Sequence, residues 1–196
     1  MSIVTLVSGG LDSTVMALLA QEEGLTQFPL FVNYGQLNQS RELDACLINF
    51  KCLGLPTPMV MQLGGYGAVV SSGLTDPNKH IFEEAFLPCR NLLFLTVGAA
   101  YAHQNGASAV AIGLLDEVFS LFPDQTKAFI KEAETLILRS LGHQLRILTP
   151  LMSFSKAEVV SIAKAKSITG TYSCHAGTDI PCGTCVACRE YVGLEV

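Results

Sequence analysis

The sequence predicts an α/β protein: an open parallel sheet with helices on both faces, followed by a small C-terminal metal-binding appendage. Short β-branched and apolar runs at residues 3–7, 28–32, 59–63 and 108–112 alternate with longer segments of helical periodicity. That alternation is typical of βαβ units and of a parallel sheet. From about residue 169 onward the periodicity ends and cysteines accumulate. We therefore expect one α/β domain at 1–168 and a cysteine-rich tail at 169–196.

Two helices can be placed from the signals at their ends. Apolar residues recur at i, i+3 and i+4 spacing across 129–141, and Gly142 ends the pattern. A second helix is expected to begin at Ser155, because Ser155 and Glu158 have the spacing of a capping box. Residues 64–80 contain four glycines and no periodicity. They predict a long surface loop, which in a compact domain is often a lid or a binding loop.

Charge and composition narrow the class of protein. Seventeen acidic and twelve basic residues give a net charge of −5, and the basic residues are scattered, which disfavours a nucleic-acid partner. The apolar start has no basic residues and predicts a strand rather than a signal peptide. The longest apolar stretch, 91–102, is shorter than the roughly 20 residues of a membrane span. We expect a cytoplasmic enzyme whose seven cysteines bind metal rather than form disulfides.

A glycine-containing loop between the first strand and an apolar helix predicts a phosphate-binding site. Backbone N–H groups converge in such a turn, and the helix dipole adds partial positive charge. Asp12 is expected either to cap the helix or to help hold Mg²⁺. No Gly-Lys-Ser/Thr follows, which excludes a Walker A loop. An ordinary βα turn capped by Asp12 or Ser13 is the alternative. The candidate nucleotide-binding residues are Ser8, Gly9, Gly10, Leu11, Asp12, Ser13 and Thr14.

Four cysteines in the tail have the spacing of a metal site. They are Cys174, Cys182, Cys185 and Cys188, in the pattern C-x7-C-x2-C-x2-C. Four thiolates suit tetrahedral Zn²⁺, and a closed four-sulfur site has a structural role. An iron–sulfur cluster is the rival interpretation. His175 adjoins the first cysteine, and we expect it to be a solvent-exposed loop residue rather than a ligand.

The loop resembles the Ser-Gly-Gly-x-Asp-Ser hallmark of the pyrophosphate-loop ATPases, which transfer AMP to their substrates. Together with the four cysteines, it makes the chain similar to the 7-cyano-7-deazaguanine synthases, the QueC family, over nearly its whole length. Further matching segments, in family order, are 34–36, 41–43, 88–91, Gly113 with Asp116, 122–124, 149–151 and Lys156. The resemblance implies an adenine nucleotide alpha hydrolase-like, Rossmann-like fold and a homodimer.

The resemblance also implies the reaction and its residues. The family adenylates 7-carboxy-7-deazaguanine, lets ammonia displace AMP, and adenylates the amide again to give the nitrile, 7-cyano-7-deazaguanine. ATP, Mg²⁺ and structural zinc are implied. The catalytic candidates are Asp12, Ser13, Arg90 and Lys156. Arg90 suits a carboxylate or a phosphate, and Lys156 suits developing negative charge. The substrate-binding candidates are Tyr34, Gln36, Arg90, Asn91, Asp116, Phe122 and Asp124.

The segment expected around the deazaguanine departs from the family pattern. The family usually has a glycine before the Arg-Asn pair, where this chain has Cys89. An arginine, a carboxylate and a thiol of the family are also replaced. The departures fall at Leu37, Cys89, Val118, Leu121, Phe122, Gln125 and Thr126.

These departures keep other functions open. One is an amide ligase that couples the activated carboxylate to another amine, such as a protein N-terminus. Another, of a different class, is a non-catalytic nucleotide-binding scaffold. Transfer RNA thiolation or lysidine formation is disfavoured by the acidic charge and by the lack of an evident RNA-binding extension.

Overall fold

The computed structural model describes residues 1–194 and contains a five-stranded, entirely parallel sheet. The spatial order of the strands is β3-β2-β1-β4-β5. The strands are β1 (Ser2–Val7), β2 (Thr26–Asn33), β3 (Met59–Gln62), β4 (Ala109–Ala111) and β5 (Arg146–Leu148). The predicted fold class and the four predicted strands are confirmed. The fifth, β5, was not predicted, because its three residues begin with the exposed Arg146 and form no continuous apolar run.

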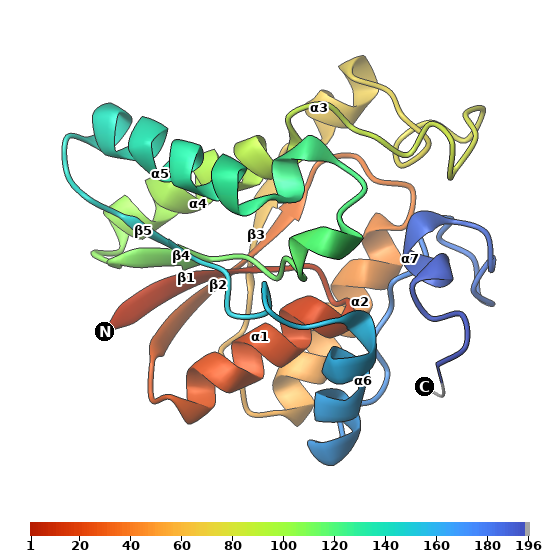
Figure 1. The fold of residues 1–196 in the computed structure, drawn as a ribbon, viewed down its shortest axis with the longest axis horizontal. Coiled ribbons are helices and arrows are strands. Elements are labelled where there is room, and N and C mark those ends of the chain that lie inside the picture. Colours follow the sequence, from red (N-terminus) through yellow and green to blue (C-terminus); the bar gives the residue numbers. More distant parts are fainter. Residues whose placement is uncertain (195–196) are drawn as a thin grey trace.

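Helices cover both faces of the sheet (Figure 1). On one face lie α1 (Leu11–Glu22), α2 (Gln39–Cys52) and α6 (Lys156–Ala165), and on the other lie α4 (Arg90–Gln104) and α5 (Lys127–Leu141). Shorter pieces are α3 (Gly64–Val69), α7 (Val186–Arg189) and two 3₁₀ turns, Glu117–Phe119 and Pro123–Gln125. Because both faces are covered, the central strands β1, β2 and β4 are largely buried, as is typical of parallel sheets.

The predicted helix ends are present. In α6 the Ser155 N–H donates to Glu158 Oε2 at 2.7 Å and the Glu158 N–H donates to Ser155 Oγ at 3.3 Å, which is the predicted capping box. Gly142 ends α5 in the left-handed conformation. The expectation of a plain surface loop at 64–80 was wrong in part. This segment begins with α3, and Leu74 is only 3% exposed because it packs against Tyr34.

The tail leaves α6 and lies beyond the carboxyl ends of the strands (Figure 1). It is tied to the main body by hydrogen bonds from Asn38 Nδ2 to the Cys174 carbonyl at 3.0 Å and from Asn49 Nδ2 to the Gly170 carbonyl at 3.1 Å. The Tyr172 N–H donates to the Gly9 carbonyl at 3.0 Å. The tail therefore contacts the glycine loop. The division at 168/169 remains a prediction, and 195–196 lie outside the described residues.

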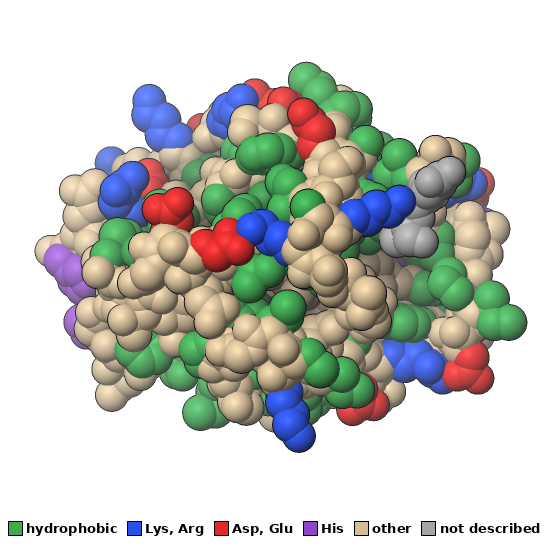
Figure 2. All heavy atoms as spheres, turned by 90° about the horizontal axis from the view of Figure 1, so that it is seen from below, with side chains coloured by type: hydrophobic (Ala, Val, Ile, Leu, Met, Phe, Trp, Pro, Cys, Tyr) green, Lys and Arg blue, Asp and Glu red, His purple; other side chains and the backbone are tan. Residues whose placement is uncertain are grey.

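The surface carries acidic and basic side chains in mixed order. Figure 2 shows them interspersed on the face below the sheet in Figure 1, without a continuous basic patch there. Among residues 1–194, no helix has the length and apolar character needed to cross a membrane.

Candidate functional site

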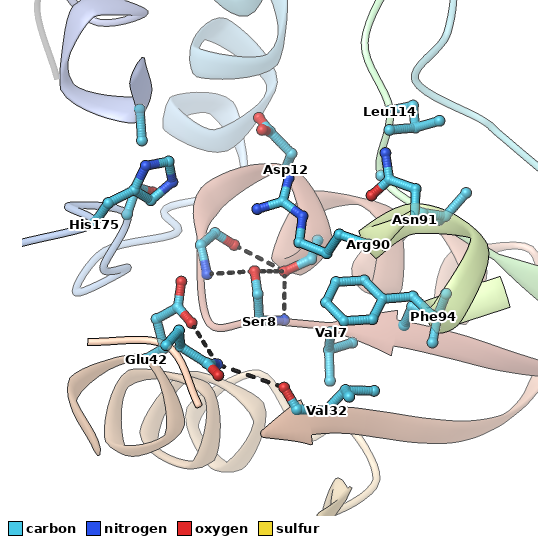
Figure 3. A pocket seen from close by; sticks show the side chains of 18 of the residues that line it. Val7, Ser8, Asp12, Val32, Glu42, Arg90, Asn91, Phe94, Leu114 and His175 are labelled. Carbon is cyan, nitrogen blue, oxygen red and sulfur yellow. Dashed lines mark hydrogen bonds between the residues drawn. The ribbon is translucent and has the colours of Figure 1, made fainter. Parts of the chain in front are cut away.

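A cavity of about 250 Å³ opens at the carboxyl ends of β1, β2 and β4. Open parallel sheets bind ligands at this edge, and β1 lies where the strand order reverses. The glycine loop, the start of α2, the start of α4 and the tail all contribute lining residues (Figure 3). Most of the predicted site residues line it: Ser8, Gly10, Leu11, Asp12, Ser13, Tyr34, Gln36, Arg90, Asn91, Phe122 and Lys156.

Hydrogen bonds of Ser8 and Ser13 fix the conformation of the glycine loop. The Ser8 N–H donates to Ser13 Oγ at 3.1 Å, and Ser13 Oγ donates to the Gly10 carbonyl at 3.2 Å. Gly10 is the N-cap of α1, and within the described residues no side chain caps this helix. The alternative in which Asp12 or Ser13 caps the helix is therefore wrong. Because the first-turn N–H groups have no side-chain acceptor, this helix end is suited to an anion.

Gly9 and Thr14 support the loop from outside the cavity. Gly9 has φ +80°, and a Cβ there would lie 2.2 Å from the Glu42 carbonyl of α2, so only glycine fits. The Thr14 hydroxyl is buried and donates to the Gly10 carbonyl at 2.9 Å. Both residues shape the loop through the chain that surrounds it.

Lys156 joins the loop to the tail. Its Nζ lies 2.9 Å from Asp12 Oδ2 and 2.8 Å from Glu190 Oε2, and it sits 4.7 Å from the centre of the Tyr191 ring. Burial opposes the charge on Lys156, but the two carboxylates outweigh it and raise its pKa. Lys156 is therefore a fixed cation beside the uncapped N-terminus of α1. Glu190 gave no signal in the sequence, because it lies 34 residues after its partner.

The structure separates two predicted carboxylates from the cavity lining. The Asp124 carboxylate accepts a hydrogen bond from the Asn91 N–H at 3.2 Å and so caps the start of α4. Asp116 accepts from the Val118 N–H at 3.1 Å and lines a neighbouring cavity of about 400 Å³ that shares Asp12 and Lys156 with the first. Asp124 thus fixes the position of Arg90 and Asn91 rather than facing the cavity.

Besides Glu190, two further titratable cavity residues were not among the predicted site residues. Glu42, in the first turn of α2, accepts a hydrogen bond from Gln36 Nε2 at 3.1 Å, and burial raises its pKa from 4.5 to about 7. His175 is partly buried and lines the cavity, so the expectation of an exposed loop histidine was wrong. Burial, assisted by the positive charge of Arg90, lowers the pKa of His175 to about 4. Its imidazole is therefore neutral at pH 7.

The four predicted metal ligands come together in the tail. The Sγ atoms of Cys174, Cys182, Cys185 and Cys188 all lie within 4.8 Å of one another. Backbone N–H groups donate to them, from Cys185 to Cys182 Sγ and from Cys188 to Cys185 Sγ, each at 3.4 Å. Such bonds stabilise thiolates, so the donor set fits a tetrahedral metal ion.

Comparison with known proteins identifies the family of this site. Residues 2–192 match the family described as "Queuosine biosynthesis protein QueC". The chain belongs to the QueC family. The "7-cyano-7-deazaguanine synthase" of Nitratiruptor sp. is 30% identical over 201 residues, covering 96% of this chain and 91% of the relative. The enzyme of the same name from Sulfurovum sp. is 32% identical over 208 residues, with 98% and 93% covered. The chain is accordingly an enzyme of an ATP-dependent ligase family.

A solved structure supports the fold. The "U34-tRNA thiolase NcsA from Methanococcus maripaludis with its [4Fe-4S] cluster" superposes with a TM-score of 0.63 at 19% identity, covering 98% of this chain and 64% of that one. At this identity the likeness concerns the fold alone. The adenine nucleotide alpha hydrolase-like architecture expected of a QueC-family chain is thus present.

Proposed function

We propose that this QueC-family chain converts 7-carboxy-7-deazaguanine to 7-cyano-7-deazaguanine with ammonia and two ATP. A carboxylate oxygen attacks the α-phosphorus of ATP, and pyrophosphate leaves. Ammonia then attacks the carbonyl carbon and AMP leaves, which gives the amide. In the second round the amide oxygen attacks another ATP, pyrophosphate leaves again, and loss of AMP and of the nitrogen protons gives the nitrile.

One observation carries the proposal: the uncapped end of α1, Arg90 and Lys156 line a single cavity. The helix end suits the pyrophosphate that leaves. Arg90 is positioned to pair with the substrate carboxylate or the α-phosphate, and Lys156 offers charge to the phosphates. All three groups stabilise negative charge, which adenylation increases at the α-phosphate.

Two metals belong to the proposal. Zn²⁺ would be held by the four tail cysteines and would fix the tail, which places Lys156 through Glu190. Mg²⁺ would accompany the ATP phosphates. Both Asp12 oxygens lie 2.9 Å from Lys156 Nζ in the free protein. Asp12 therefore contributes to Mg²⁺ binding only if this ion pair opens.

The reaction is tested by product mass. Protein, ATP and 7-carboxy-7-deazaguanine are incubated with and without ammonium, and AMP, pyrophosphate and product are quantified. We expect a nitrile that requires ammonium, with two AMP formed per product. Cleavage of ATP between its outer phosphates, or no pyrophosphate with any amine, contradicts the proposal.

The loop is tested by Ser13→Ala. This change removes the bonds that Ser13 Oγ makes to Ser8 and Gly10. We expect pyrophosphate release to fall about 100-fold, the low end of the loss when one stabilising donor is removed from an active site. Ser161→Ala is the matched control, since Ser161 Oγ bonds only its own helix, at the Ala157 carbonyl. Unchanged turnover in Ser13→Ala would refute the role of the loop.

A second candidate is an amide ligase that uses a larger amine, such as a protein N-terminus. Its support is apolar exposure near the second cavity: Val118, Phe119 and Leu121 are 75%, 60% and 60% exposed, and Phe119 lines that cavity. An enzyme that uses only ammonia would not need this exposed apolar surface. The same assay distinguishes the two, because a stable amide adduct with a peptide amine, formed without a nitrile, supports this ligase.

A further inference from the structure

His175 carries a buried polar atom that nothing in the free protein satisfies. Three side-chain atoms in residues 1–194 are buried without a hydrogen-bond partner: Thr5 Oγ1, Gln27 Oε1 and His175 Nδ1. Of these residues, His175 alone lines the cavity. Figure 3 shows its ring turned toward the cavity, on the side where Glu42 also lies. An unpaired buried polar atom costs free energy, so it calls for an explanation.

The backbone on both sides of His175 is held by hydrogen bonds from residues at the start of α2. Asn38 Nδ2 donates to the Cys174 carbonyl at 3.0 Å, and Arg41 Nε donates to the Gly177 carbonyl at 2.8 Å. Gly177 has φ +68°, and a Cβ there would lie 2.9 Å from the Leu37 carbonyl. The start of α2 thus fixes the backbone from which the imidazole faces the cavity.

We propose that His175 is a specificity-determining residue that hydrogen-bonds the heterocyclic ring of the carboxylate substrate. This inference rests on the proposed function, because it concerns which ligand fills the cavity. In this proposal the glycine loop takes the triphosphate. His175 lines the same cavity as Gln36, Glu42 and Arg90, on the side where Glu42 lies, and the charge of Arg90 acts on it. A guanine-like ring presents adjacent N–H donors and a carbonyl acceptor, which match a carboxylate, an amide and an imidazole.

The inference predicts opposite effects on binding and on stability. His175→Phe keeps a ring but removes both nitrogens, so it deletes the bond to the ligand and also the unpaired atom of the free protein. We expect about tenfold weaker binding of 7-carboxy-7-deazaguanine, corresponding to one lost hydrogen bond. We expect the Tm of the unliganded protein to be unchanged or higher by about 2–4 °C. His175→Asn, which retains a polar nitrogen near the Nδ1 position, should lose less affinity than His175→Phe.

The experiment is calorimetric titration of the zinc-loaded protein with a non-hydrolysable ATP analogue, followed by 7-carboxy-7-deazaguanine. Zinc content is measured for every variant. His103→Phe, an exposed position near the end of α4, makes the same exchange away from the cavity and should change neither affinity. Affinity for the analogue should stay within about twofold in His175→Phe, because in this proposal His175 contacts the carboxylate substrate and not the nucleotide. A twofold change corresponds to about 0.4 kcal/mol.

Two results overturn the inference. One is parental affinity of His175→Phe for the carboxylate, and the other is an equal loss of affinity for the ATP analogue. Failure of the proposed function is distinct, because the parent protein would then bind the analogue but not 7-carboxy-7-deazaguanine. In that case the assignment of 7-carboxy-7-deazaguanine as the ligand of His175 is wrong as well.

Discussion

At the scale of single residues, Cys89 has a backbone conformation, and Glu42 an environment, that is unfavourable for its residue type. Cys89 has φ +58° at the N-cap of α4, a left-handed conformation that favours glycine. The QueC-family pattern has glycine at this position. Glu42 is a carboxylate that lines the cavity, where burial disfavours its charged form. Each of these residues gives a prediction.

Replacing Cys89 by glycine should stabilise the protein. The left-handed conformation costs a non-glycine residue about 1–2 kcal/mol, part of which the greater freedom of glycine in the unfolded chain offsets. We expect the free energy of unfolding in urea to rise by roughly 0.5–1 kcal/mol. Cys52→Gly is the control, because Cys52 is an exposed cysteine within α2 and should lose stability on the same change. Equal effects at the two positions would show that backbone conformation is not the cause.

Replacing Glu42 by glutamine should stabilise the protein at alkaline pH. The pKa of Glu42 is about 7 in the folded protein and 4.5 ordinarily, so the folded state binds more protons between these values. The contribution of Glu42 to the free energy of unfolding is fully present below about pH 4.5 and is lost as the pH rises through 7. Glutamine does not ionise, so Glu42→Gln avoids this loss. We expect its free energy of unfolding at pH 8 to exceed that of the parent by roughly 1–2 kcal/mol, a value reduced for screening by cavity water. Urea unfolding at pH 5 and pH 8 measures it. A gain that is the same at both values contradicts the assignment.

At the scale of elements, the tail does two things: it gathers four cysteines, and it reaches back to the glycine loop. A Cβ on Gly10 would lie 3.3 Å from Ser173 Oγ, and Glu190 pairs with Lys156 of α6. The tail therefore forms one wall of the cavity beside the glycine loop. We expect its order to depend on a bound metal ion, because the segment after α6 has little regular structure of its own: among the described residues, α7 is its only helix, with four residues.

Removing the metal should release the tail and weaken nucleotide binding. With a strong chelator we expect limited proteolysis to cut after about residue 168 and to leave the sheet intact. Affinity for an ATP analogue should fall about tenfold, as expected when a charged partner of the site is lost. Cys185→Ala should reproduce the effect, whereas Cys52→Ala, an exposed thiol outside the cluster, should not. Metal analysis that finds iron instead of zinc would favour the iron–sulfur interpretation, and loss of the whole fold would contradict the separate tail.

At the scale of the whole molecule, charge distribution separates this chain from RNA-modifying proteins of similar fold. The net charge is −5, and the face in Figure 2 intersperses both signs. Binding to a phosphate backbone depends on gathered Lys and Arg. The likeness to a tRNA thiolase at 19% identity concerns the fold alone.

We therefore expect no complex with transfer RNA in a mobility-shift assay. Basic nucleic-acid-binding proteins associate non-specifically at about 1–100 µM, so protein at about 10 µM and low salt gives a clear comparison. A salt-sensitive complex would contradict this expectation and revive the RNA-modifying alternative.

Local features were readable from the sequence. The glycine loop, the Ser155 capping box, the Gly142 helix end and the cysteine spacing each involve residues close in the chain, and each occurs as predicted. Strands with a continuous apolar run were also readable. Strand β5 was not, because Arg146 interrupts its apolar run, and its pairing with β4 is visible only in the fold.

The sequence by itself determined the family, the parallel α/β fold and the residues of the loop and the metal cluster. Only the tertiary structure decided which side chains share the cavity. Glu42 enters it from α2 and His175 and Glu190 enter it from the tail, whereas Asp124 turns to cap α4. The physical reason is that chain crossings at the carboxyl edge of the sheet determine these distances, and no spacing along the chain encodes them.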